Sequence, residues 1–178
     1  LEELNLSRNE ITSNGAEALG LAIKGNYKLK TLNLIRNKLG DEGVKLLVSP
    51  ENIDEPPASG DNEENQVDEY TLLLDKNNIG ATGVKHLVNA LEGPNWNKIF
   101  KILSLDNNKI GDKGAEHLAA ALMQKTLHYA SLASDNLDYP SMHLVYNKIG
   151  DEGAKKLAKA LPGVQNLKVL DLTYNEIK

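Results

Sequence analysis

The chain contains no cysteine among its 178 residues. This absence excludes a disulfide framework, a thiol nucleophile and a zinc site built on cysteine. No apolar run approaches the roughly 18 residues that a membrane-spanning helix needs, and no signal peptide is visible. We therefore expect a cytoplasmic protein, in a reducing compartment and without a membrane partner.

Sequence signatures of catalysis and phosphate binding are also missing. The chain has neither a G-x-x-x-x-G-K-[ST] loop nor a G-x-G-x-x-G motif behind a predicted strand, and no histidine has a serine and an acid at a recognisable spacing. Residues 49–68 contribute −7 to the net charge of −5, so the remainder carries +2 and has no basic footprint for nucleic acid. We expect no enzymatic activity, no cofactor, no bound metal and no nucleic-acid partner.

What the chain does contain is a repeated pattern, L-x-x-L-x-L-x-x-N-x-I, in which leucine or isoleucine stands last. Successive copies place their asparagines 28, 40, 31, 39 and 28 residues apart. Self-similarity at this period predicts a repeat architecture. The asparagines of the six copies are Asn9, Asn37, Asn77, Asn108, Asn147 and Asn175.

A second motif, a glycine four residues before a leucine, follows the first five copies. Each repeat should therefore run strand, loop, helix, loop, with helices predicted over 82–91, 112–124 and 151–161. The asparagine amide is expected to bond backbone groups in the bend after the strand, and Asp41 is expected to cap the second helix. The glycines are Gly15, Gly43, Gly83, Gly114 and Gly153.

These two motifs together resemble the leucine-rich repeat family, in its ribonuclease-inhibitor-like subclass, which includes Ran GTPase-activating proteins and NOD-like receptor repeat domains. The segment from Asn147 to Leu157 is close to the consensus of that subclass. The resemblance implies an α/β fold, a right-handed β-α solenoid or horseshoe with a parallel concave sheet and convex helices. Residues 1–178 should form a single solenoid. Both ends fall inside a motif without a polar cap, so we expect a fragment of a longer array.

Two segments interrupt the repeat. Residues 49–68 are acidic, proline-containing and poor in large apolar side chains, so we expect a flexible acidic insertion. Residues 125–141 include Asp135, which stands 27 residues after Asn108 but only 12 before Asn147. This region is either an irregular repeat without a helix or a gap in the chain.

The candidate binding residues lie on the strand face opposite the helices and at the strand ends. Arg8 and Arg36 precede the repeat asparagine in consecutive copies and should lie side by side. Tyr146 and Tyr174 suit contact anchors, because tyrosine is enriched at interface hot spots. The full set of candidate partner-binding residues is Arg8, Arg36, Asp75, Asp106, His143, Tyr146 and Tyr174.

His86 and His117 share one repeat position and suggest a metal or pH-sensing site, although ordinary helix histidines fit the pattern better. The favoured function is a non-catalytic scaffold that binds a protein partner through the concave face and ascending loops, as a component of a larger complex. The alternatives are a GTPase activator of the Ran-activating type, and a NOD-like receptor or ciliary assembly repeat domain.

Overall fold

The structure, a computed structural model, describes residues 1–23, 28–48, 69–91, 99–124, 140–164 and 166–178. Strands and helices alternate along the chain, and a short 3-10 turn follows the last helix. We number the repeats so that repeat 1 holds β1 and α1. The elements are β1 (Glu3–Asn5), α1 (Ser13–Ile23), β2 (Thr31–Asn33), α2 (Gly40–Leu47), β3 (Glu69–Leu73), α3 (Ala81–Leu91), β4 (Ile99–Ser104), α4 (Gly111–Met123), β5 (Ser141–His143), α5 (Asp151–Ala160), η2 (Leu161–Gly163) and β6 (Val169–Asp171).

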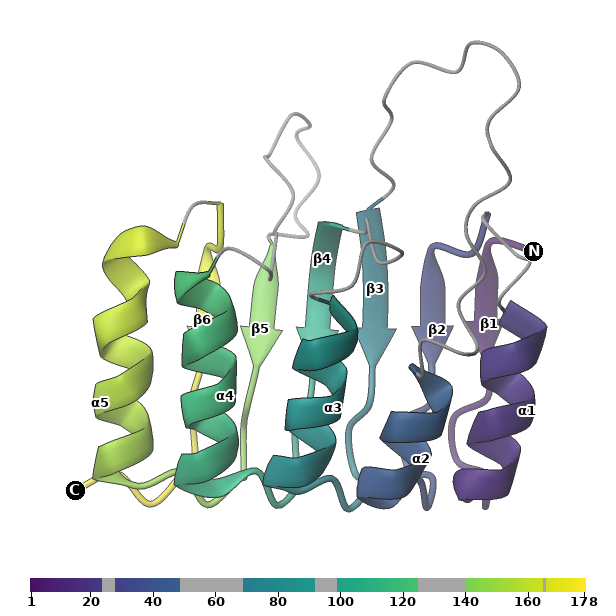
Figure 1. Ribbon diagram of the computed structural model, residues 1–178, viewed down its shortest axis with the longest axis horizontal. Helices are drawn as coiled ribbons and strands as arrows, with labels where there is room; N and C mark the ends of the chain where they lie inside the picture. Colours follow the sequence, from purple (N-terminus) through teal and green to yellow (C-terminus); the bar gives the residue numbers. More distant parts are fainter. Residues whose placement is uncertain (24–27, 49–68, 92–98, 125–139, 165) are drawn as a thin grey trace, which may run out of the picture.

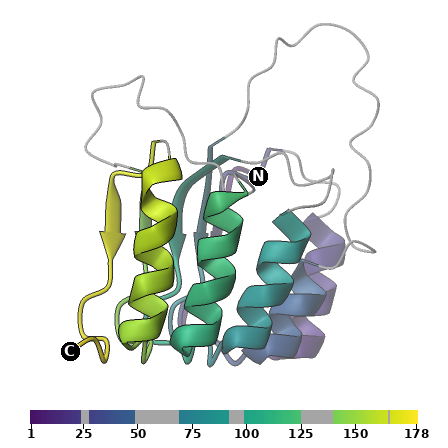
Figure 2. The ribbon, with the colours of Figure 1, turned by 60° about the vertical axis from the view of Figure 1, so that its left-hand side comes forward.

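The six strands form one parallel sheet in the order β1-β2-β3-β4-β5-β6, so every strand pairs with the strand of the next repeat. All strand arrows point to the same edge of the sheet (Figure 1). The five helices of the described residues, α1 to α5, lie in a row over one face of that sheet (Figure 2). The predicted α/β solenoid is confirmed, and the three predicted helices begin and end within one residue of 82–91, 112–124 and 151–161.

Leucines of successive repeats meet in register to form the core. Leu32, Leu72 and Leu103 pair across three strands and are at most 1% exposed. The equivalent Leu4 and Leu170 are only partly buried, because each has a described neighbouring strand on one side only. Strands this short are stabilised by the apolar surface that adjacent repeats bury against each other.

The repeat asparagines connect each bend to its neighbour. The Nδ2 group of Asn108 donates to the carbonyl oxygens of Leu74 in repeat 3 and Leu105 in its own repeat, at 3.0 and 2.9 Å. Its Oδ1 atom accepts from the N–H groups of Asn77 and Ile79, at 3.0 and 2.9 Å. A side chain that is 5% exposed thus satisfies backbone groups which have no strand partner.

The bends adopt two alternating conformations. In repeats 2 and 4 the glycine three residues after the asparagine is left-handed, with φ of +59° at both Gly40 and Gly111. In repeats 3 and 5 the residue directly after the asparagine is left-handed instead, with φ of +64° at Asn78 and +58° at Lys148. The sequence does not predict this alternation, because repeats 3 and 5 also have glycine at the third position.

The acid at the start of a helix bonds the next repeat rather than its own helix. The Asp41 carboxylate accepts from the Gly80 N–H at 2.6 Å, and α2 has no side-chain cap. The expected capping role of Asp41 is therefore wrong. The helix begins one residue earlier, at Gly40, so the Asp41 side chain faces repeat 3.

Two of these acids explain the motif glycines of α3 and α5, Gly83 and Gly153. A Cβ atom added at Gly153 would lie 2.7 Å from Oδ1 of Asp112 and 3.0 Å from its Cα atom. A Cβ atom at Gly83 would lie 2.6 Å from Oδ1 of Asp41. Glycine at this position lets the start of one helix approach the start of the next.

Two predicted irregular segments fall largely outside the described residues. The acidic insertion at 49–68 and residues 125–139 of the irregular repeat are not part of the description. Strand β4 pairs directly with β5, with Leu103 opposite Met142. Among the described residues, no helix has the length and apolar character needed to cross a membrane.

We expect Asn108→Ala to lower the free energy of unfolding by about 3 kcal/mol or more, because several buried backbone groups lose their partner. Asn9→Ala is the control: Asn9 is exposed, and within the described part of the chain its side chain bonds only the carbonyls of Leu6 and Ser7 in its own repeat. Its effect should stay below about 1 kcal/mol. Urea unfolding measures both, and equal losses would contradict a bridging role for Asn108.

The alternation predicts unequal effects of the same substitution at equivalent positions. Gly111→Ala should cost about 1 kcal/mol, because a side chain disfavours positive φ. Gly150→Ala should cost less, because φ there is −96° and an added Cβ atom would lie 3.4 Å from the nearest atoms, in Asp112. Thermal or urea unfolding of the two variants tests this, and a larger loss at Gly150 would overturn the assignment of bend conformations.

Candidate functional site

The face of the sheet opposite the helices carries polar side chains in register. Outward positions at the strand ends line up from repeat to repeat, and no described helix covers them (Figure 2). We call this surface the open face. Its aligned residues at the carboxyl end of the strands are Asn5, Asn33, Leu73, Ser104, His143 and Asp171.

Next to the open face, the residue before each repeat asparagine forms a second line, which we call the edge row. All its members are exposed and have positive φ, between +55° and +59°. Backbone hydrogen bonds hold the line in register, for example from the Arg8 N–H to the Ile35 carbonyl at 2.7 Å and from the Arg36 N–H to the Asp75 carbonyl at 2.8 Å. The edge row consists of Arg8, Arg36, Lys76, Asn107, Tyr146 and Tyr174.

The first four repeats form an open groove of about 400 Å³ between the edge row and the open face. Three cations line it, together with two carboxylates and the aliphatic side chain of Ile35. The groove therefore combines charge of both signs with an apolar patch. Its lining residues are Ser7, Arg8, Ile35, Arg36, Asp75, Lys76, Asp106 and Asn107.

The two carboxylates of the groove bond backbone and hydroxyl groups of the next repeat. Asp75 accepts from the Ser104 hydroxyl and from the Asp106 N–H at 2.8 Å, and Asp106 accepts from the Val145 N–H at 2.7 Å. Burial raises the pKa of Asp106, and the charges of Asp75 and Asp171 add to the rise, while the Val145 N–H opposes it. The groove acids thus fix neighbouring repeats relative to each other.

His143 lies among acids at the centre of repeats 4 to 6. Its Nε2 atom is 2.9 Å from the buried Ser141 hydroxyl. His143 contributes to lowering the pKa of both Asp106 and Asp171. The pKa of Asp171 is lowered chiefly by hydrogen bonds from Thr173. This part of the open face is acidic.

Tyr146 and Tyr174 stack on each other at the C-terminal end of the edge row. Their ring centroids are 4.5 Å apart and the planes differ by 6°. The two residues are still 50% and 67% exposed. Each ring limits the motion of the other, so the pair presents a rigid aromatic surface to solvent.

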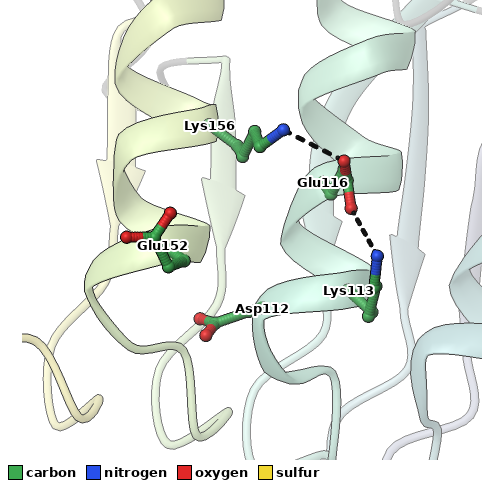
Figure 3. A pocket seen from close by; sticks show the side chains of 5 residues that line it. All are labelled: Asp112, Lys113, Glu116, Glu152 and Lys156. Carbon is green, nitrogen blue, oxygen red and sulfur yellow. Dashed lines mark hydrogen bonds and ion pairs between the residues drawn. The ribbon is translucent and has the colours of Figure 1, made fainter.

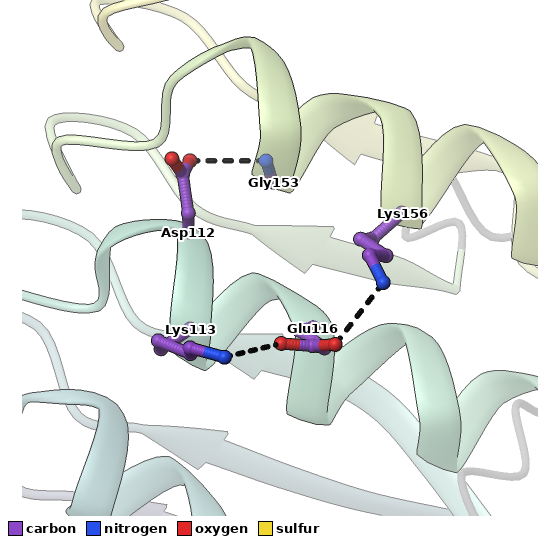
Figure 4. Close-up of polar contacts among 5 residues, drawn as sticks. All are labelled: Asp112, Lys113, Glu116, Gly153 and Lys156. Atoms are coloured by element: carbon purple, nitrogen blue, oxygen red, sulfur yellow. Dashed lines mark hydrogen bonds and ion pairs between the residues drawn. The ribbon is translucent and has the colours of Figure 1, made fainter.

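A contrasting pocket of about 230 Å³ lies on the helical face, lined by Asp112, Lys113, Glu116, Glu152 and Lys156 (Figure 3). Glu116 accepts from both lysines at 3.1 Å, and Asp112 accepts from the Gly153 N–H (Figure 4). These bonds from Lys156 and Lys113 lower the pKa of Glu116. Glu152 bonds Lys155 at 2.7 Å. The charged side chains that line this pocket have partners within the chain, so we do not assign the pocket as the binding site.

The structure groups the sequence-predicted residues into three sets. Arg8, Arg36, Asp75 and Asp106 share the groove, the two tyrosines form the stacked pair, and His143 belongs to the acidic part of the open face.

Sequence reasoning missed Lys76, Asn107 and Ile35 as groove residues. Their repeat positions are the signal that could have identified them: Lys76 and Asn107 stand directly before the repeat asparagine, as Arg8 and Arg36 do. His86 and His117 are half-buried on α3 and α4. Within the described part of the chain, no three histidine, aspartate or glutamate side chains cluster as metal ligands.

The chain matches a known family over several segments. The family described as Leucine Rich repeat matches residues 1–20, 25–48, 97–119, 141–158 and 165–178, more than half of the chain. Comparison with curated proteins gives no match. Repeat 3 lies between matched segments and has a strand and a helix, as its neighbours do.

The pKa of Asp106 is raised and that of Asp171 is lowered, so replacing each by asparagine should change the free energy of unfolding in opposite directions. The folded state raises the pKa of Asp106, so ionisation of Asp106 costs stability as the pH rises above its unfolded pKa of about 3.9. Asp106→Asn should therefore raise the free energy of unfolding near neutral pH, with the gain shrinking in acid.

Asp171 is the control. Its pKa is lowered in the folded state, so the ionised carboxylate stabilises the fold when the pH is above the unfolded pKa. Asp171→Asn should lower the free energy of unfolding near neutral pH and have a smaller effect in acid. Urea unfolding of the two variants, near neutral pH and in acid, measures both effects. Effects of the same sign would show that the pKa shifts have been assigned wrongly.

Proposed function

Because the chain belongs to the leucine-rich repeat family, whose repeats generally mediate protein–protein interaction without catalysis, we propose that it is a non-catalytic scaffold. Its partner is a protein, bound by the open face and the edge row. The observation that carries this proposal is the residue content of the edge row.

The backbone requires a left-handed conformation at every edge-row position. This conformation costs an L-residue other than glycine about 1 kcal/mol or more, and asparagine tolerates it better than most. The chain has asparagine only at position 107 and places arginine, lysine or tyrosine at the other five. Folding alone favours glycine or asparagine there, so the long side chains suggest selection for contact with a partner.

The geometry of the row also suits binding. The ladder hydrogen bonds fix its backbone before any partner arrives, so association needs little further ordering of the main chain. The stacked pair of Tyr146 and Tyr174 adds exposed aromatic area in one orientation, and tyrosine and arginine are enriched among interface hot spots. The row therefore provides anchors at both of its ends.

The proposal also covers where the protein works and in what assembly. The absence of cysteine is consistent with a reducing compartment, so we propose a cytoplasmic location. A solenoid face that spans six repeats contacts extended surfaces readily, which suits a component of a larger complex.

The surface assignment predicts a selective loss of binding. A chain carrying Arg8→Ala, Arg36→Ala, Tyr146→Ala and Tyr174→Ala should recover at least about tenfold less partner from cytosol than the wild type, since several hot-spot residues are lost. Quantitative pull-down followed by mass spectrometry measures the recovery.

The matched control changes four residues of the helical-face pocket, Lys113, Glu116, Glu152 and Lys156, to alanine. These exposed ion pairs contribute little to stability, and the substitutions leave the net charge unchanged. Its recovery of partner should equal that of the wild type. Equal recovery by both quadruple variants would remove the open face and edge row as the binding surface.

A further inference from the structure

We infer that the N-terminal half of the edge row binds a carboxylate-rich protein segment of the partner. The inference rests on the proposed function and adds the chemistry of what is recognised. Three successive members of the row, Arg8, Arg36 and Lys76, are cations, and all three line the same groove. No later position of the row is basic.

The three cations are spaced to act together. The ladder of backbone hydrogen bonds continues through these positions, so neighbouring members lie about one strand separation apart, roughly 5 Å. Carboxylates one turn apart on a helix are roughly 5–6 Å from each other, and those on one face of a strand about 7 Å. One acidic segment can therefore meet all three cations, two of which are arginines able to bind carboxylate bidentately.

These cations have no acidic partner among the described residues. Elsewhere the described ion pairs join Lys30 to Glu2, Lys38 to Glu10, Lys45 to Glu42, Lys113 and Lys156 to Glu116, and Lys155 to Glu152. In the groove, by contrast, Asp75 and Asp106 turn their oxygens to backbone N–H and hydroxyl groups of the next repeat. The side-chain cations stay available to an external anion.

The acids of the same surface favour a short acidic protein segment over a nucleic acid. Asp75 lies beside Lys76 in repeat 3, and the acids Asp106 and Asp171 follow in repeats 4 and 6, where the edge row has no cation. A nucleic-acid backbone carries regularly spaced charge and would run from the cations into this acidic stretch. A protein segment can confine its carboxylates to the basic end and place uncharged groups on the tyrosine pair.

The polarity of the row also orients the partner. The basic end belongs to repeats 1 to 3, and the aromatic and acidic end belongs to repeats 4 to 6. Reversing a bound segment would bring its carboxylates against Asp106 and Asp171, and like charges in contact disfavour the wrong arrangement. The row thus distinguishes the two directions in which an acidic segment could lie.

Fluorescence anisotropy with short fluorescein-labelled probes tests the inference. One peptide alternates Glu with Ser, a second replaces every Glu by Gln, and the third probe is a single-stranded RNA of the same length. The wild type should bind the Glu peptide more tightly than the other two probes. The variant with Arg8→Gln, Arg36→Gln and Lys76→Gln should bind the Glu peptide about tenfold more weakly, since three ion pairs are lost.

The control variant carries Lys85→Gln, Lys159→Gln and Lys168→Gln. These exposed lysines lie outside the groove, and their removal changes the net charge equally. Its affinity for the Glu peptide should fall less than about twofold. Equal losses in both triple variants, failure of the wild type to bind the Glu peptide, or tighter binding of the RNA would each overturn the inference.

A cytosol pull-down with the same variants separates this inference from the proposed function. Suppose that Tyr146→Ala with Tyr174→Ala abolishes recovery of the partner while the Arg8, Arg36 and Lys76 triple variant retains it. The scaffold function then stands, and the inference that the partner is recognised through an acidic segment is wrong. If both variants retain the partner, the surface itself is wrong. Loss in the triple variant, with loss of Glu-peptide binding, supports both.

Discussion

The hydrogen bonds of the repeat asparagines are the interaction on which the rest of the structure depends. A strand of three residues cannot exist alone, and the bend after it leaves backbone groups without strand partners. Asn37, Asn77, Asn108 and Asn147 fill these gaps from inside the core, at 0 to 7% exposure. Each side chain bonds its own bend and that of the preceding repeat, for instance Asn147 with Leu105 and Val145. Strand pairing, leucine packing and the edge row all follow from bends held in this way.

Neighbouring repeats are nevertheless not identical. The bends alternate between a left-handed glycine, as at Gly111, and a left-handed residue directly after the asparagine, as at Lys148. The asparagine contacts alternate with them: Asn108 Oδ1 accepts from Ile79 at 2.9 Å, whereas Asn147 Oδ1 accepts from Ile110 at 3.4 Å. Where the glycine is not left-handed, its N–H turns to the helix-start acid of the previous repeat, as Gly150 does to Asp112 at 2.7 Å. The two conformations therefore satisfy the same groups by different routes.

In the binding surface, the backbone sets where each residue lies and the side chains set the chemistry that a partner meets. The asparagine ladder fixes the main chain of the edge row, and the side chains there make few contacts with the fold, so they are free to vary in chemistry. In this chain the variation is ordered: basic in repeats 1 to 3, polar in repeat 4 and aromatic in repeats 5 and 6. The helical face shows the opposite condition, because charges such as Glu116 and Lys156 neutralise each other across repeats. The groove cations Arg8, Arg36 and Lys76 have no such ion pair among the described residues, so they can bind a partner's anion.

The spacing of Leu32, Leu34 and Asn37, and its recurrence, was enough to determine the repeat architecture, the parallel order of the strands and the positions of most helices. It also placed Arg8 and Arg36 together, because equivalent positions in a solenoid must be neighbours. It did not decide the alternating bends or the bond from Asp41 to Gly80, nor did it identify Lys76 as a groove residue. These features depend on contacts between repeats, where the same residue types can satisfy the same backbone groups in more than one way. Periodicity thus determined what one repeat is, and packing of one repeat against the next decided how its bend closes and which side chains share a surface.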